Sequence, residues 1–243
     1  MNDLTAIHVI PVPPHWFFPL MWMAAGWPYL LFAFAIGSIP FGLLIGRAFF
    51  ATDIRATGSG NIGAANALRT LGTKAGAAVL LLDAAKGVVA VLAAWFLWLH
   101  VPLYIAAYGV RIEVDASSGP IWALVPLAGI AAVLGHCYTP WLRLRGGKGV
   151  ATYLGATFAL SWESGLAFLA VWLAVVMPSG LASLGSMLGT IAGGAFLVAT
   201  GARYGDSGLV FAAGSALLVI WKHRENIGRL RAGTENRLTL FKK

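Results

Sequence analysis

The stretch from Gly72 to Trp98, GTKAGAAVLLLDAAKGVVAVLAAWFLW, decides the fold class. Its interior is apolar except for Asp83 and Lys86. A helix that crosses a bilayer needs roughly 20 mostly apolar residues, and this stretch is longer. The sequence therefore predicts a transmembrane helix at residues 72–98.

Six further apolar runs accompany this stretch, separated by turns rich in Gly, Pro, Ser or charge. They lie at 27–50, 120–138, 150–162, 164–178, 181–200 and 207–221. We therefore expect an all-α polytopic membrane protein of about seven transmembrane helices, built as a single domain over residues 1–243. The run 150–162 is short for a full crossing and is expected to be a half-helix or one arm of a hairpin. Residues 1–26, which contain several prolines, are expected to form an uncleaved N-terminal extension at the outer surface.

Composition supports this class of protein. Hydrophobic residues make up 59% of the chain and charged residues 11%, with a mean hydropathy of +0.79, whereas soluble domains carry about 25% charged residues. The single cysteine, Cys137, excludes an intramolecular disulfide and a cysteine metal cluster. Neither a metal nor another cofactor is expected. The net charge of +8 is attributed to loops beside membrane lipid, and no nucleic-acid partner is expected.

The distribution of Lys and Arg predicts the orientation, because cytoplasmic loops of membrane proteins are enriched in both. Arg111 and Arg203 fall on one side of the predicted bundle, and Lys86 lies within a helix. The opposite side carries Arg47, Arg55, Arg69, Lys74, Arg143, Arg145, Lys148, Lys222, Arg224, Arg229, Arg231, Arg237, Lys242 and Lys243. We predict that the N-terminus lies outside and the C-terminus in the cytoplasm.

The loop at residues 53–69 has the composition of a phosphate cradle. Closely spaced glycines allow backbone N–H groups to approach an anion, side-chain amides and a hydroxyl add donors, and Arg69 offers a two-pronged guanidinium. The other candidate phosphate-binding residues of this loop are Gly58, Ser59, Gly60, Asn61, Gly63 and Asn66. The alternative is a glycine-rich turn at the membrane interface.

A second candidate anion site is the loop Gly146-Gly147-Lys148-Gly149, which leads into the apolar run at 150–162. Backbone amides at a helix N-terminus, with a lysine beside them, favour an anion. The spacing is not that of a nucleotide-binding Walker A loop. A plain basic turn is equally compatible with these residues.

The C-terminal segment at 222–236 contains His223 and Asn226, which share a face if the segment is helical. That face is a candidate for completing a polar site, and Glu225 is a candidate structural polar residue. A solvated basic tail attracted to anionic lipid is the alternative.

Asp83 and Lys86 lie three residues apart in the predicted helix 72–98, where a charge in lipid requires a partner. We predict that they form a mutual ion pair with a structural rather than a catalytic role. His136 is interpreted as a helix-end histidine, because no second ligand lies at metal-binding spacing.

The ordered motifs resemble one family over nearly the whole chain. That family is the bacterial integral membrane glycerol-3-phosphate acyltransferase that uses acyl phosphate. This chain resembles it in Gly37–Gly42, in the Gly-Ser-Gly-Asn-Ile-Gly loop, and in Leu82–Gly87. It is also similar in Gly135-His136 with Gly146–Thr152, and in His223–Asn226 with Gly233-Thr234-Glu235. The chain departs from the family's pattern at Ala65, where the family commonly carries threonine.

The resemblance implies a seven-helix fold of the bacterial inner membrane with the motif loops facing the cytoplasm. It implies active-site or phosphate-binding roles for Ser59, Arg69, Lys148, His223 and Asn226, and a glycerol 3-phosphate loop at 146–149. It also implies acyl phosphate and glycerol 3-phosphate as substrates, lysophosphatidate and phosphate as products, and a soluble enzyme that supplies acyl phosphate.

Because acyl phosphate is already activated, positioning and charge stabilisation can suffice without a covalent intermediate. Either His223 or a substrate phosphate, whose second pKa is about 6, can accept the hydroxyl proton. The alternative function is a membrane carrier for phosphorylated solutes, although a carrier is expected to place its polar residues near the bilayer midplane.

Overall fold

The structure is a computed structural model. Every element that it describes is helical, as the apolar runs predict. It describes residues 17–107, 121–201 and 204–238, without the side chains of 17–25, 97–107 and 121. The N-terminal residues 1–16, Arg111, Arg203, Lys242 and Lys243 therefore lie outside the described residues. The elements are α1 (Phe17–Gly37), α2 (Phe41–Phe50), η1 (Ile54–Ala56), α3 (Ala64–Leu71), α4 (Thr73–Ala107), α5 (Ile121–Cys137), η2 (Pro140–Leu142), α6 (Val150–Leu160), α7 (Trp162–Ser179), α8 (Ala182–Thr200), α9 (Gly205–Lys222) and α10 (Arg224–Arg231).

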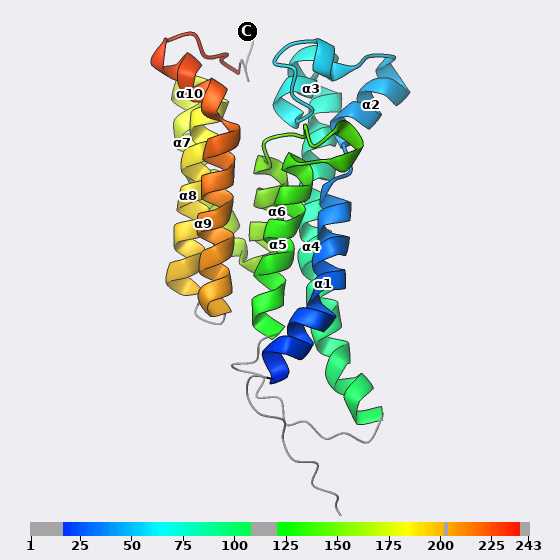
Figure 1. The fold of residues 1–243 in the computed structure, drawn as a ribbon. Helices are drawn as coiled ribbons and strands as arrows, with labels where there is room; N and C mark the ends of the chain where they lie inside the picture. Colours follow the sequence, from blue (N-terminus) through cyan, green and yellow to red (C-terminus); the bar gives the residue numbers. More distant parts are fainter. Residues whose placement is uncertain (1–16, 108–120, 202–203, 239–243) are drawn as a thin grey trace, which may run out of the picture.

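The long helices run side by side in one bundle (Figure 1). α7 packs on α8 and α8 on α9, while α1 packs on α5 and α4 on α6; α5 also contacts α9. The chain between α2 and α4, the α5–α6 connection and α10 gather at one end of the bundle (Figure 1). This end therefore collects all three polar motifs.

Five described stretches are long and apolar enough to cross a membrane: Gly26–Phe50, Thr73–Phe96, Trp122–Leu142, Trp162–Ser179 and Ala182–Thr200. α6 has 11 residues and reaches only about 16 Å at 1.5 Å per residue, which agrees with the expected half-helix. α9 has 18 residues, with Asp206 and Lys222 near its ends, and is not among the five. The predicted count of about seven spans stays a prediction.

The expected first span at 27–50 is not one continuous helix. α1 begins at Phe17, inside the predicted extension, and ends at Gly37, and α2 begins at Phe41. Pro40 has no N–H to continue the helical hydrogen bonds and disfavours helical geometry in the residue before it. The break turns α2 away from the axis of α1 (Figure 1).

Close approach of α4 and α6 fixes the centre of the bundle. A Cβ on Gly155 would lie 1.9 Å from the carbonyl oxygen of Ala84, so only glycine permits this contact. Small residues at such contacts are typical of helix packing in lipid. Next to them, buried Tyr153 stacks on Phe211 with ring centroids 5.2 Å apart, and its hydroxyl donates to the carbonyl of Thr190 at 2.9 Å. α6 is thereby held against both halves of the bundle.

Candidate active site

The three polar motifs line one cavity of about 400 Å³ at the loop-bearing end of the bundle. Its polar wall is formed by Ser59, Asn61, Gly63, Asn66, Arg69, Asp83, His136, Lys148, Gly149, His223, Asn226, Arg229, Glu235 and Asn236. Its apolar wall comes from α4, α6, α7 and α8, and includes Ala77, Leu80, Val150, Leu154, Phe168, Leu169 and Trp172. The cavity therefore joins a charged compartment to an apolar one.

Asn66 organises the first loop from inside. Its side chain is buried, and its Nδ2 donates to the carbonyl of Ile54 at 2.7 Å and to that of Asn61 at 2.8 Å. Its Oδ1 accepts from the backbone N–H of Ser59 at 2.8 Å. These bonds commit the Asn66 amide to the loop itself, so Asn66 shapes the cradle instead of offering a free amide to a ligand.

The other predicted residues of the first loop divide into two groups. Ser59, Asn61, Gly63 and Arg69 line the cavity, whereas Gly58 and Gly60 do not. Gly58 and Gly60 have φ values of +59° and +68°, a left-handed conformation that side chains disfavour. These two glycines therefore make the turns that present Ser59.

The second loop differs from the prediction, because the backbone amides of Gly146 and Gly147 are bonded within the protein and do not face the cavity. The N–H of Gly146 donates to the carbonyl of Cys137 at 3.2 Å, and that of Gly147 to His136 at 3.0 Å. The glycines are needed because a Cβ on Gly147 would lie 2.0 Å from His136 Nε2. The loop is thus docked on the end of α5, and Lys148 and Gly149 are its cavity-lining residues.

His223 and Asn226 share the face that closes the cavity, as the predicted helical spacing indicates. Asn226 Oδ1 accepts a hydrogen bond from Lys148 Nζ, which connects the second loop to α10. Asn226 Nδ2 donates to Glu235, whose other carboxylate oxygen accepts from Arg229 Nε at 2.8 Å. A polar chain therefore runs from Lys148 to Arg229.

Glu235 takes the structural place that was expected of Glu225. Glu225 is exposed on α10 and does not line the cavity, because residues 223 and 226 share the inward face and 225 falls between them. Glu235 is brought in by the turn at Gly233, whose φ is +70°. In the sequence, Glu235 was visible only as part of the Gly233-Thr234-Glu235 motif. Helical spacing could not relate it to Asn226, because the two residues do not lie in the same helix.

Burial sets the protonation of two titratable groups that line the cavity, Lys148 and His223. Burial, opposed by Glu235, lowers the pKa of Lys148 to about 8, so its ammonium is still mostly charged at pH 7. Burial and the nearby Lys148 lower the pKa of His223 to about 4, so its ring is neutral at pH 7. His223 Nδ1 lies 2.8 Å from the Val219 carbonyl; it must donate there, which leaves Nε2 as an acceptor.

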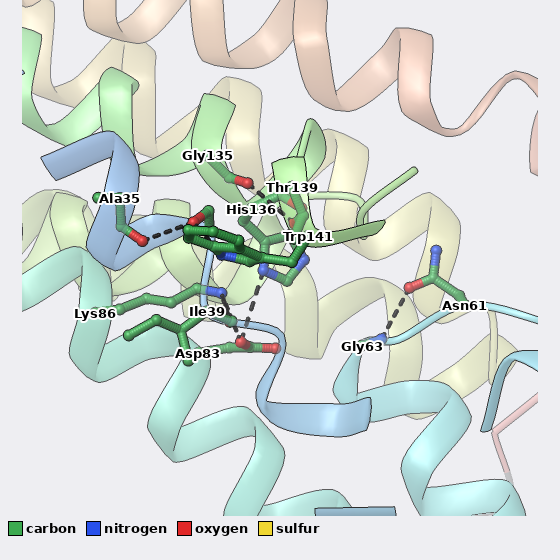
Figure 2. A network of polar contacts seen from close by, with 11 residues as sticks. Ala35, Ile39, Asn61, Gly63, Asp83, Lys86, Gly135, His136, Thr139 and Trp141 are labelled. Atoms are coloured by element: carbon green, nitrogen blue, oxygen red, sulfur yellow. Dashed lines mark hydrogen bonds and ion pairs between the residues drawn. The ribbon is translucent and has the colours of Figure 1, made fainter. Parts of the chain in front are cut away.

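Asp83 and Lys86 form the predicted ion pair, with 2.9 Å between Lys86 Nζ and Asp83 Oδ1. The structure adds His136, whose Nδ1 lies 3.6 Å from the same oxygen. All three side chains are buried, and Figure 2 shows Asp83 between Lys86 and His136. Across the described residues, no group of three or more His, Cys, Asp or Glu side chains is placed to hold a metal ion.

Fold and cavity together define a class of protein: a polytopic helical membrane protein with a site for an anionic amphiphile. Arg69, Lys148 and Arg229 supply positive charge to a cavity whose wall also contains many apolar side chains. Cationic side chains and helix termini are typical partners of phosphate groups.

Comparison with known proteins gives the family. The profile described as "Glycerol-3-phosphate acyltransferase" matches residues 27–233, and the chain belongs to this family. The glycerol-3-phosphate acyltransferase of Zymomonas mobilis is 40% identical over 207 residues, 84% of this chain and 92% of that protein. That of Myxococcus xanthus is 43% identical over 211 residues, covering 86% and 97%. The crystal structure of PlsY, an integral membrane glycerol 3-phosphate acyltransferase, in its glycerol 3-phosphate form matches with a TM-score of 0.72 and 36% identity, covering 88% of this chain and 95% of that one.

Proposed function

We propose that this protein acylates glycerol 3-phosphate to lysophosphatidate with acyl phosphate as the donor, and that the reaction takes place in the cavity described above. The family supports the acceptor and the product, and a PlsY structure in a lysophosphatidic acid form matches with a TM-score of 0.69. The observation that carries the site assignment is that Arg69 and Lys148, from separate loops, line one cavity with His223 and Asn226. Two phosphates brought together repel each other, and these cations offset that repulsion.

The apolar wall supports an acyl-chain donor. Leu154 of α6 and Phe168 and Trp172 of α7 line the cavity from helices and not from the charged loops. In the proposed reaction the sn-1 hydroxyl oxygen bonds to the acyl carbonyl carbon, the bond from that carbon to the phosphate oxygen breaks, and phosphate leaves. No covalent enzyme intermediate is needed, because the donor is an activated anhydride held beside its acceptor.

The low pKa of His223 supports a substrate phosphate as the proton acceptor. A group with a pKa of about 4 is a weaker base than a phosphate with a second pKa of about 6. In this proposal the neutral His223 Nε2 orients the hydroxyl by accepting its hydrogen bond. A rate that survives in His223→Ala supports the phosphate as base, and a loss of several hundredfold in a folded variant supports the histidine.

The decisive experiment supplies purified protein in detergent with acyl phosphate and glycerol 3-phosphate and measures lysophosphatidate and phosphate. Parallel reactions receive the same acyl chain as a coenzyme A thioester. Transfer from acyl phosphate with equimolar release of phosphate supports the proposed donor. Acyl transfer from the thioester alone would refute acyl phosphate as donor. If the protein transfers no acyl group but transports phosphate esters into liposomes that contain it, the carrier is favoured.

Matched variants test whether the reaction takes place in the cavity. Lys148→Met removes the cation that is bonded to Asn226, while Lys74→Met removes an exposed lysine at the start of α4 that does not line the cavity. We expect Lys148→Met to lose about 100-fold or more in kcat/KM, as is usual for removing a group that stabilises reacting charge. Equal activity of the two variants would move the reaction elsewhere.

The charge distribution supports a bacterial inner-membrane location with the cavity facing the cytoplasm. Apart from Lys86, the described Lys and Arg residues lie in elements at the cavity-bearing end, in agreement with the positive-inside rule. That face is also where a soluble enzyme that makes acyl phosphate would deliver it. In a Cys137→Ala background, single cysteines at Thr70 and at Ser179 are labelled with a membrane-impermeant thiol reagent in intact cells and in inverted vesicles, since cytoplasmic positions react only in the latter.

A further inference from the structure

We infer that Asp83, Lys86 and His136 form a positioning cluster for the acyl-transfer reaction, which holds the two phosphate-binding loops at a fixed separation. This inference rests on the proposed function. It goes beyond an ion pair that neutralises charge in lipid, because Lys86 bonds the backbone of Ile39, just before α2, and His136 lies against Gly147 of the second loop. Figure 2 shows the cluster where α1, α4 and α5 meet.

Lys86 connects Asp83 to the break between α1 and α2. Its Nζ lies 2.9 Å from Asp83 Oδ1 and donates to the carbonyl of Ile39 at 3.0 Å. That carbonyl belongs to the break that Pro40 introduces, where no continuous helix supplies its hydrogen bond. The lysine therefore fixes the point at which α2 turns away.

α2 passes this position on to the first loop. A Cβ on Gly42 would lie 1.9 Å from the carbonyl oxygen of Ile62, so α2 rests directly on the backbone next to Gly63. Gly63 lines the cavity, and its N–H donates to Asn61 Oδ1 at 2.9 Å. Movement of Ile39 therefore displaces the loop that presents Ser59 and Arg69.

His136 connects Asp83 to the second loop. Its ring lies against Gly147, as the 2.0 Å approach of a Cβ at that position shows, and its carbonyl accepts the Gly147 N–H at 3.0 Å. Lys148, the next residue, carries the ammonium that bonds Asn226. One buried carboxylate is thus linked to both loops, which makes the separation of the loops depend on it.

The test must separate positioning from stability, because an unpaired buried charge is destabilising in itself. Asp83→Asn and Lys86→Met each leave one partner without its counter-charge. The double variant removes both charges and with them most of that penalty, but it still lacks the Lys86 bond to Ile39. Tyr204→Phe is the matched control, since it loses the buried bond from Tyr204, just before α9, to the carbonyl of Leu160 at the end of α6, and neither residue lines the cavity.

We expect the double variant to regain most of the Tm lost by the single variants, while its kcat/KM for glycerol 3-phosphate stays about 10- to 100-fold below wild type. Such a loss is the size produced by a displacement of about 1 Å between reacting groups. Tyr204→Phe should lower Tm with kcat/KM unchanged. Rates are measured per mole of folded protein, with KM and kcat determined separately.

Wild-type kcat/KM in the double variant would overturn the inference and leave the cluster a purely structural ion pair. If both single variants and the double variant fail to fold while Tyr204→Phe folds, the cluster determines folding and the inference is likewise overturned. If wild-type protein itself transfers no acyl group, the proposed function fails first, and this result is distinct from either of the others.

Discussion

Gly147→Ala tests how tightly the second loop is docked on α5. The added Cβ would lie 2.0 Å from His136 Nε2, 2.8 Å from Cδ2 and 2.9 Å from Cε1. The loop would have to retreat by about 1.4 Å to restore an ordinary contact of 3.4 Å. Because the His136 ring is buried and its Nδ1 lies 3.6 Å from Asp83 on the side away from the loop, we expect the loop to move instead of the ring, carrying Lys148 with it.

Overpacking of a buried contact costs about 1–3 kcal/mol, and a displacement of about 1 Å near reacting groups costs about 100-fold in rate. We therefore expect a lower Tm and a loss of about 100-fold in kcat/KM for glycerol 3-phosphate. Gly228→Ala is the matched control: a Cβ there meets nothing within 4 Å, and alanine in α10 should raise stability slightly. Equal Tm and kcat/KM in the two variants would refute the reasoning.

Three further predictions concern the same cavity. Asn66→Ala removes bonds to four backbone groups and should lower both activity and stability, the latter by about 1–3 kcal/mol. Replacement of the exposed Asn236 by alanine should leave Tm unchanged in thermal unfolding. For ligand-free protein, the folded-state pKa of His223 lies at about 4, below its ordinary 6.5, so the unfolded state binds more protons and stability falls as pH drops from about 6.5 to 4. The loss of unfolding free energy approaches about 3 kcal/mol and should appear in unfolding curves measured at these pH values. If His223→Gln loses as much stability over the same pH range, His223 is not the group responsible. Since the pKa of Lys148 is about 8, kcat/KM should decline above pH 8 as its positive charge is lost, and Lys148→Arg should remove that decline; an unchanged pH profile in Lys148→Arg would count against it.

Much of the fold could be predicted from the sequence, because a chain in lipid must satisfy its backbone within helices. Each apolar run became helix, and the short run at 150–162 became the 11-residue α6. The break at Ser38–Pro40 was not predicted, although Pro40 was visible. A proline in an apolar run is compatible with a kinked or a broken helix, and here the Lys86 bond to Ile39 belongs to tertiary structure that the run itself does not contain.

The candidate site could be predicted as a set of loops but not as a set of contacts. Lys148, Arg69, His223 and Asn226 all line the cavity, which follows from their motifs being at one end of the bundle. Which atoms face a ligand depends on neighbours distant in sequence. The Gly147 amide is taken by His136, and such pairings have no signature in local spacing.

The exchange of Glu225 for Glu235 has the same cause. Both acids lie in the C-terminal segment, and helical periodicity alone favours the nearer one. The turn at Gly233 reverses the chain so that Glu235 reaches Asn226 and Arg229. Helical periodicity applies only within a helix. A partner such as Glu235, which lies after the helix and folds back onto it, can be found only from the motif or from the structure.

The cavity draws its wall from Ser59 near the beginning of the bundle to Leu238 after its last helix. A ribosome must therefore release nearly the whole polypeptide before the pocket can close. Partly inserted chains hold the first loop but lack the carboxylate of Glu235 that steadies Asn226. We therefore expect chains that stop before Glu235 to lack acyltransferase activity, because part of the cavity wall is missing.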